Sequence, residues 1–152
     1  MIAVIQRVEE ASVSISGEEI SRIGKGLVVL VGISRDDTDR DVHFIAEKIT
    51  AMRIFSDESG KMNRSVLDVN GETLIVSQFT LLADVWSGRR PSFTEAAASN
   101  VAKPLFDRVV DRVKRLGVGV KTGVFGAMME VKLVNDGPVT VIVDTRKLKG
   151  KS

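Results

Sequence analysis

The segment from Leu74 to Leu81, LIVSQFTL, contains the residues whose types and spacing most directly suggest chemistry. A continuous apolar run, typical of a strand covered on both faces, changes abruptly to polar residues at Ser77. Along such a strand Ser77 and Phe79 face one side, and Gln78 and Thr80 face the other. Backbone N–H groups that leave the sheet here could form an oxyanion hole, although a strand that emerges into solvent fits the same pattern.

Other catalytic groups are scarce in this chain. The absence of cysteine excludes thiolate catalysis and sulfur-ligated metals. The single histidine, His43, lies one step from apolar positions of a helical pattern, and no GxSxG motif is present, which argues against a Ser-His-acid triad. One histidine also excludes a His-rich zinc site, and we expect no metal and no other cofactor, although carboxylate-bound magnesium stays possible. Thr80 is the obvious nucleophile, with Ser77 positioning nearby groups, but no general base adjoins either residue.

The segment from Val134 to Val141, VNDGPVTV, presents a conflict between two local signals. Asp-Gly between apolar stretches predicts a two-residue hairpin turn joining two strands, AMMEVKLV and VTVIVDT. Pro138 contradicts that prediction, because it has no N–H for the ladder and restricts Gly137 before it. A purpose other than a simple turn is therefore expected at Gly137 and Pro138.

The apolar periodicity predicts the elements that must position these residues. Residues 2–16 indicate two strands, followed by a short strand near residues 19–24 and an apolar strand at 26–33. Helical spacing predicts helices over 37–53 and 94–116, where Pro104 lies either in the first turn or between two helices. The mixed order predicts an α/β fold (mixed α and β), with helices packed over twisted, largely antiparallel, barrel-like β-sheets in a single domain, residues 1–152.

Charge and hydropathy bound the partners only loosely. The net charge of +2 does not by itself indicate a nucleic-acid binder. Two basic groups fit either solvated helix and chain ends or RNA contacts: Arg112, Lys114, Arg115 and Lys121, and then Arg146, Lys147, Lys149 and Lys151. Trp86 and Phe93 could stack on bases beside Arg89 and Arg90, but covering a core edge is the simpler interpretation. No apolar run approaches the roughly 20 residues of a membrane span, and no signal peptide is recognisable, so we expect a cytoplasmic protein.

The motifs SQFTL (Ser77 to Leu81), GRRPSF and NDGPVT (Asn135 to Thr140), in this order, resemble the signature of the D-aminoacyl-tRNA deacylases, the D-tyrosyl-tRNA deacylase family. The resemblance runs along the whole chain. It implies a homodimer in which Gly137 and Pro138 of one subunit, joined by a cis peptide bond, reach into the pocket of the other. There they would hold the substrate's amino group and exclude an L side chain, whereas glycine would pass.

The same resemblance implies hydrolysis of the ester between the amino acid and the terminal adenosine at the 3′ acceptor end of tRNA. Backbone N–H groups around Gln78, Phe79 and Thr80 would stabilise the oxyanion, and the substrate's 2′-hydroxyl would assist. Phe125 and Met129 match positions near the adenosine and the pocket wall, although both could be core residues. Two alternatives stay open: a dimeric RNA-binding module without catalysis, and an esterase for small molecules.

Overall fold

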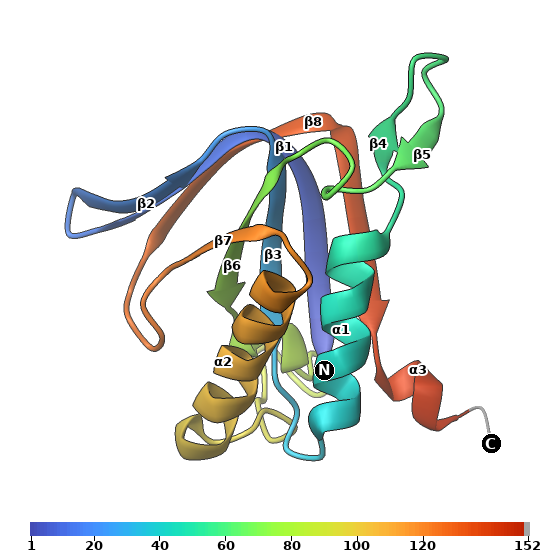
Figure 1. Ribbon diagram of the computed structural model, residues 1–152. Helices are drawn as coiled ribbons and strands as arrows, with labels where there is room; N and C mark the ends of the chain where they lie inside the picture. The colour runs from blue at the N-terminus through green and yellow to red at the C-terminus, as the bar shows by residue number, and fades with distance from the viewer. Residues whose placement is uncertain (151–152) are drawn as a thin grey trace.

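Six strands form one twisted sheet that nearly closes into a barrel, with two long helices against it (Figure 1). The computed structural model describes residues 1–150. The elements along the chain are β1 (Ile2–Ile15), β2 (Glu18–Ile23), β3 (Gly26–Gly32), α1 (Asp39–Ala51), β4 (Phe55–Ser56), β5 (Met62–Arg64), β6 (Glu72–Ser77), the short 3-10 helix η1 (Phe79–Leu82), α2 (Ser99–Arg115), β7 (Gly119–Thr122), β8 (Glu130–Asp144) and α3 (Arg146–Lys149). The mixed fold predicted from the sequence is confirmed.

Strand β1 organises the sheet, because it pairs antiparallel with β2, β3 and β8. Strands β3, β6 and β7 continue the sheet in parallel pairs, and the strand order is β2-β1-β3-β6-β7. Side chains link the two ends of this order: Ser21 Oγ donates to the Thr122 carbonyl at 2.9 Å, and Lys121 Nζ donates to the Arg22 carbonyl at 2.6 Å. These bonds hold β7 next to β2 and bring the barrel close to closure.

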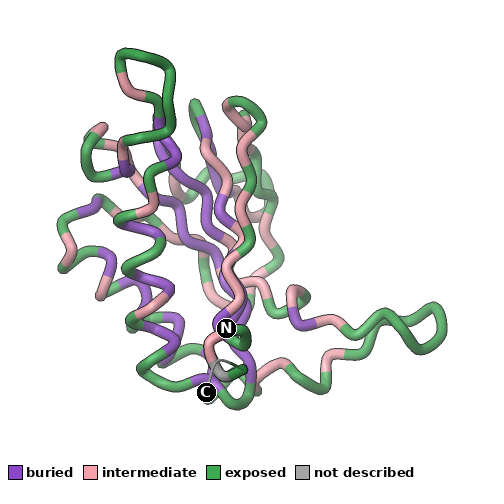
Figure 2. Tube along the Cα trace, turned by 90° about the vertical axis from the view of Figure 1, so that its right-hand side faces the viewer, coloured by how far each residue is buried: buried purple, intermediate pink, exposed green. Residues whose placement is uncertain are grey.

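The main core lies between the sheet and the two long helices (Figures 1 and 2). Helix α1 begins with a capping box between Thr38 and Asp41 and buries the apolar stripe predicted for it, including Ile45 and Ile49. Helix α2 buries Phe106 and the side chains around it against the same core. Within residues 1–150, no helix is long and apolar enough to cross a membrane.

Two predicted element boundaries and the predicted position of Pro104 differ from the structure. Residues 2–15 form one long strand rather than two, because β1 continues from its pairing with β3 into its pairing with β2. Helix α2 begins at Ser99, so residues 94–98 are irregular. Pro104 is the sixth residue of an unbroken α2 and lies in the second turn, beyond the first-turn position where its missing N–H would cost nothing.

The hairpin suggested by Asp136-Gly137 is absent, because both halves of the expected strand pair belong to β8 and pair with β1. On β1 the register advances two residues between Gln6 and Val8, while on β8 it advances five, between Asn135 and Thr140. The Asn-Asp-Gly-Pro segment is therefore a bulge with three extra residues. A long-range pairing thus overrides the local turn signal.

Candidate functional site

A cavity of about 770 Å³ opens where β6 leaves the sheet. Its walls come from the end of β6, from η1, from residues 93–99 and from the segment that joins β7 to β8. The cavity brings together six of the eight site residues predicted from the sequence: Ser77, Gln78, Phe79, Thr80, Phe125 and Met129. Its volume lies within the range of about 300–1,000 Å³ that small-molecule sites occupy.

The chain leaves β6 in a way that frees backbone donors. The Gln78 N–H still donates to the Val31 carbonyl of β3, at 2.8 Å, and is the last rung of the sheet. The first bond of η1 then runs from the Leu81 N–H to the Gln78 carbonyl, at 3.3 Å. The N–H groups of Phe79 and Thr80 precede that bond and have no carbonyl to reach inside the helix. Two successive amides at the cavity wall can therefore stabilise a negative oxygen.

Side chains fix the turn that carries these amides. The Gln78 side-chain amide donates to the Thr80 hydroxyl, so the two residues are coupled. The ring of Phe79 meets Phe93 edge to face, with centroids 5.1 Å apart, and this contact ties η1 to the segment that follows the GRRP motif. Phe93 is half-buried and packs on this exposed ring at the cavity wall rather than on an edge of the buried core clusters.

Phe125 and Met129 form the opposite wall, and both also pack against the core. The Phe125 ring lies 5.9 Å from the Phe106 ring of α2. Met129 packs against a second buried cluster that includes Val13 and Leu74. The two roles left open by the sequence are therefore not exclusive, because each side chain lines the cavity and contacts the core.

The cavity wall, in the part of the chain that the structure describes, contains no ionisable side chain. Its polar groups are the hydroxyls of Ser77, Thr80 and Ser99, the Gln78 amide and the backbone. His43 is an exposed residue of α1 and does not line the cavity. The wall residues of one subunit can therefore contribute positioned dipoles, hydroxyls and bound water to a reaction, but no charged base.

The cis peptide bond between Gly137 and Pro138 lies outside this cavity. Both residues belong to the β8 bulge, which Arg7 holds by donating from Nε to the Asp136 carbonyl at 3.0 Å. Val8 of β1 pairs with Asn135, next to the bulge, and on its other side with Gly26 at the start of β3. Gly26 in turn pairs with Glu72 at the start of β6. Ser77 ends β6 five residues further on, roughly 16 Å along the sheet at about 3.3 Å per residue. Within one subunit, the bulge and the cavity therefore lie at different ends of the sheet.

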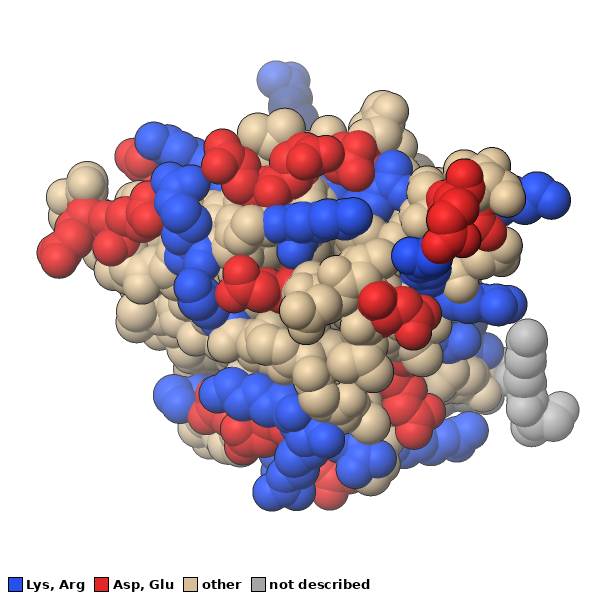
Figure 3. Space-filling view, turned by 45° about the horizontal axis from the view of Figure 1, so that its top comes forward, with Lys and Arg blue, Asp and Glu red and all other residues tan. Residues whose placement is uncertain are grey.

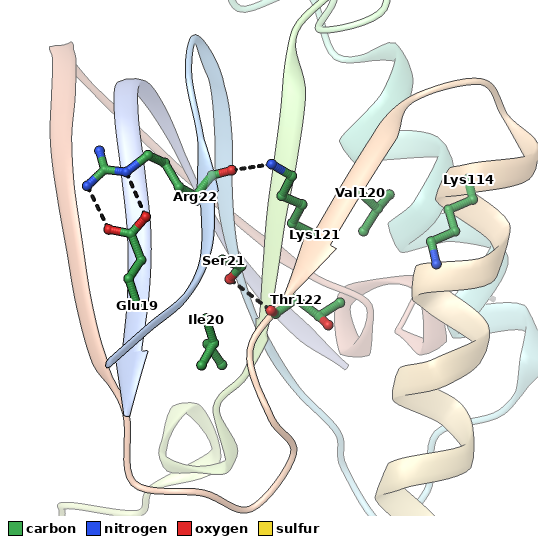
Figure 4. A pocket seen from close by; sticks show the side chains of 8 residues that line it. All are labelled: Glu19, Ile20, Ser21, Arg22, Lys114, Val120, Lys121 and Thr122. Atoms are coloured by element: carbon green, nitrogen blue, oxygen red, sulfur yellow. Dashed lines mark hydrogen bonds and ion pairs between the residues drawn. The ribbon is translucent and has the colours of Figure 1, made fainter. Parts of the chain in front are cut away.

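A second hollow, of about 480 Å³, lies between β2 and β7 (Figure 4). Glu19 and Arg22 form two hydrogen bonds on its rim, at 2.9 and 2.8 Å, and this pairing lowers the pKa of the Glu19 carboxyl. Lys121 donates to the Arg22 carbonyl in the same hollow. The Glu19 and Arg22 side chains are thus paired with each other, and Lys121 is used to hold β7 next to β2, so the hollow is a weaker candidate for chemistry than the cavity at β6.

The predicted basic residues differ in whether they are paired with acidic side chains. In Figure 3, Lys and Arg side chains are interspersed with Asp and Glu over the face that is shown. Arg146 is paired with Asp144 at 2.8 Å. Lys114 and Arg115 are exposed near the end of α2 and are available to a polyanion. Lys151 lies outside the described residues.

Several cavity residues were not predicted from the sequence, among them Ala96, Ala97, Ala98, Ser99 and Met128. The run EAAAS favours the start of a helix, because alanine has a high helix propensity. In the structure its small side chains line the space in front of η1. Small residues give no chemical signal, so only the tertiary arrangement reveals their role.

Comparison with known proteins gives a consistent result. The sequence model of a family described as D-Tyr-tRNA(Tyr) deacylase matches residues 4–144. A protein of Chlorobaculum parvum named D-aminoacyl-tRNA deacylase is 56% identical over 148 residues, which cover 97% of this chain and 99% of that protein. The protein of the same name from Thermomicrobium roseum is 54% identical, with 100% of this chain and 99% of that protein covered.

Solved structures agree with the fold. The structure of a protein named c-Myc DNA Unwinding Element Binding Protein matches this chain with a TM-score of 0.90 and 42% sequence identity. The match covers 95% of this chain and 98% of that chain. A second, described as a probable eukaryotic D-amino acid tRNA deacylase, is 20% identical with a TM-score of 0.79, over 94% of this chain and 98% of its own, and supports the fold.

Proposed function

Since the chain belongs to the D-Tyr-tRNA(Tyr) deacylase family, we propose that it hydrolyses the ester bond of D-aminoacyl-tRNA and releases the amino acid and free tRNA. The observation that carries this proposal is the family match over residues 4–144, together with relatives named D-aminoacyl-tRNA deacylase at 54% and 56% identity over nearly the whole chain. The cavity at the end of β6 supports it, because it offers positioned amides and a wall of polar and apolar groups. A cytoplasmic location, where aminoacyl-tRNA is used, stays a prediction.

The proposed reaction proceeds by attack of water on the ester carbonyl. The carbonyl oxygen gains negative charge in the tetrahedral intermediate, and the N–H groups of Phe79 and Thr80 donate to it, with Gln78 fixing the turn. The bond from the carbonyl carbon to the ribose oxygen then breaks, and the attacking water's proton reaches that leaving oxygen through the neighbouring 2′-hydroxyl. Ser77 orients the entering groups at the strand end. The Thr80 hydroxyl stays an alternative nucleophile.

We propose that a second copy of the chain completes this site with its Gly137 and Pro138. The bulge lies roughly 16 Å along the sheet from its own cavity, so it is free to enter another subunit's cavity. Strand β8 pairs with β1 on one edge and with no other strand of residues 1–150, and it exposes Val134 and Ile142. A long unpaired apolar edge is normally covered, and a homodimer would cover it.

The partner's backbone carbonyls at Gly137 and Pro138 would bind the substrate's amino group and leave no room for an L side chain. A thousandfold preference for the D ester corresponds to about 4 kcal/mol. One missing methylene contact cannot supply that difference, whereas a clash with backbone can. Glycine has no side chain to exclude, so glycyl-tRNA is expected to be hydrolysed as well.

The decisive measurement is release of amino acid from matched D-aminoacyl-, L-aminoacyl- and glycyl-tRNA by the purified protein with a chelator present. We expect fast loss of the D and glycyl esters and survival of the L ester. Binding of tRNA with every ester intact would instead favour a binding module, and the 42% identical protein is indeed named as a binder of a DNA element. Cleavage of simple amino-acid esters without any preference for tRNA would favour a small-molecule esterase.

The dimer proposal has its own test, independent of catalysis. Sedimentation should give a mass near twice the 16.5 kDa of one chain. Mixing a Gly32→Ala subunit, in which a Cβ would lie 2.9 Å from the Gln78 carbonyl oxygen and displace the η1 amides, with a Gly137→Ala subunit should then restore part of the rate and of the D-to-L ratio. One of the two sites in the mixed dimer would combine an unaltered cavity with an unaltered Gly137-Pro138 segment. A monomer with full activity would overturn the shared site.

A further inference from the structure

The loop from Asp84 to Ser92 is a fully exposed stretch of the described chain, and the proposed reaction does not use it. All nine of its residues are exposed, and Figure 2 shows the run as a green loop that projects from the body. Trp86, the only tryptophan of the chain, is 94% exposed and does not cover a core edge as the sequence suggested. Tryptophan is highly buried on average in folded proteins, so an exposed indole at this position is a candidate surface for binding a ligand.

Hydrogen bonds hold the base of the loop in a defined geometry. Asp84 and Ser92 exchange two backbone bonds, from the Asp84 N–H at 2.7 Å and from the Ser92 N–H at 2.9 Å. The Asp84 carboxylate also accepts a hydrogen bond from the Trp86 N–H, at 3.0 Å. Gly88, with φ of +73°, allows the chain to reverse between the two sides. The indole is therefore presented from a closed hairpin rather than from a frayed segment.

Both ends of this hairpin adjoin residues that line the cavity. On one side the chain enters it directly from η1, which carries Phe79 and Thr80. On the other side the chain leaves it at Phe93, which lines the cavity and packs edge to face on Phe79. The hairpin is therefore joined at both ends to residues of the cavity wall, so a polymer attached to a group inside the cavity can reach it.

The charges of the hairpin favour a polyanion. Arg89 and Arg90 are exposed, and neither guanidinium has a carboxylate partner among the side chains that the structure describes. The nearest acidic side chains along the chain are engaged: Asp84 accepts the Trp86 N–H, and Glu95 is paired with Arg35 at 3.2 Å. Two available cations beside an exposed indole are the combination that binds single-stranded nucleic acid, in which bases stack on aromatic rings and phosphates meet arginine.

We propose that the Asp84–Ser92 hairpin is a nucleobase platform, in which Trp86 stacks on an unpaired base of the RNA that carries the ester, while Arg89 and Arg90 contact the flanking phosphates. This inference rests on the proposed function, because an ester bound in the cavity would bring the RNA that carries it close to the hairpin. The unpaired 3′ nucleotides that precede the terminal adenosine are the occupant. Stacking does not discriminate strongly among bases, so the platform would contribute affinity and register rather than sequence specificity.

The composition of the chain provides a direct probe of this contact. With one tryptophan and no tyrosine, fluorescence excited near the red edge of indole absorption comes from Trp86 alone. We would titrate the protein with an RNA hairpin that carries no amino acid, mimics the acceptor stem and ends in an unpaired 3′ overhang. The same hairpin with a blunt end would serve as the comparison. The overhang should quench the emission strongly, and the blunt hairpin should not.

Two substitutions then separate stacking from a merely exposed side chain. Trp86→Ala should weaken binding of the overhang hairpin on the order of 5- to 150-fold and raise KM similarly, with kcat unchanged, and Trp86→Phe should recover much of the loss. Val85→Ala, at the neighbouring exposed position of the same hairpin, is the matched control and should bind like the wild type. Replacing both Arg89 and Arg90 by alanine should weaken binding and reduce the slope of log Kd against the logarithm of the salt concentration by about one to two.

The outcomes distinguish this proposal from the deacylase proposal. The fluorescence probe is RNA without an attached amino acid, so binding is measured separately from hydrolysis. Quenching by this RNA, with no hydrolysis of aminoacyl-tRNA in the separate assay, would support the platform and overturn the deacylase assignment. Rapid deacylation with fluorescence and KM unaffected by Trp86→Ala would overturn the platform alone. An emission maximum that is blue-shifted in the free protein and moves on dilution would place Trp86 at a contact between subunits and would also overturn it.

Discussion

Gly32 at the end of β3 controls where η1 can sit, and replacing it by alanine tests whether the Phe79 and Thr80 amides do the chemistry. A Cβ added at Gly32 would lie 2.9 Å from the Gln78 carbonyl oxygen and 2.5 Å from Cδ2 of Leu82. Leu82 can change its rotamer, but the Gln78 carbonyl is backbone and accepts the first bond of η1. The substitution must therefore move the turn that carries the amides.

The size of the effect follows from these distances. Carbon and oxygen need about 0.4 Å more separation than the 2.9 Å available, so the turn shifts by roughly half an ångström. Because a 1 Å displacement can cost on the order of 100-fold in rate, Gly32→Ala should lower kcat about tenfold. Overpacking costs typically about 1–3 kcal/mol, and a domain with about 5 kcal/mol to lose would still be roughly 97% folded. Unfolding therefore cannot account for a tenfold loss.

The assay is single-turnover deacylation of D-aminoacyl-tRNA at saturating enzyme, accompanied by thermal unfolding of each variant. Gly24→Ala is the matched control, since a Cβ there meets nothing within 4 Å and should leave both rate and stability nearly unchanged. A folded Gly32→Ala protein with the wild-type rate constant would refute the assignment of the η1 amides. Equal losses in both variants would show that the effect is not specific to η1.

Three further predictions concern the other parts of the site and the fold. Thr80→Ala should keep activity within about tenfold if the amides dominate, whereas complete loss in a folded dimer would indicate a nucleophilic hydroxyl. Gly137 has φ of +137°, and a Cβ there would lie 2.8 Å from Cγ2 of Val139. Gly137→Ala should therefore lower the free energy of unfolding in urea by roughly 1–3 kcal/mol and reduce the ratio of D-ester to L-ester hydrolysis. An unchanged ratio would contradict the role of Gly137 in chiral selection. Hydrogen bonding from Arg146 lowers the pKa of Asp144 below its ordinary value, so this stabilisation is present above about pH 4 and is lost as the pH falls further. Asp144→Asn should therefore lose more stability at pH 7 than at pH 3, and equal losses would show that the pair does not contribute through its charge.

The elements with a strong apolar period were predictable from sequence. Helix α1 has buried residues at helical spacing behind a Thr-Asp cap, and both signals come from residues close together in the chain. Strand β3 is an apolar run that both faces of the sheet cover. In these elements local preference and tertiary packing agree, so the local pattern was sufficient.

Strand β8 was mispredicted because the turn signal comes from neighbouring residues, whereas the conformation of β8 is determined by its pairing with β1, which is far away in the sequence. Asp136-Gly137 favours a tight turn when only its neighbours are considered. In the protein, β1 is long enough to pair with both flanking stretches at once, and its antiparallel ladder on either side outweighs the preference of one dipeptide. The proline that spoiled the hairpin is tolerated because the bulge needs no ladder bond at that position.

The chemistry of the site was only partly readable for a related reason. The change from apolar to polar residues at Ser77 located the end of β6, since burial ends where the sheet ends. The expected alternation of faces from Ser77 to Thr80 was wrong, because the chain turns into the 3-10 helix η1 at Phe79. The groups that we expect to act on the ester are backbone amides of η1, and any residue other than proline carries the same amide. Their competence comes from the turn, which depends on Gly32, on the Gln78–Thr80 bond and on the Phe93 contact from a distant loop. A site built from main-chain donors is therefore recognisable in sequence through a family signature, whereas its mechanism becomes arguable only from the fold.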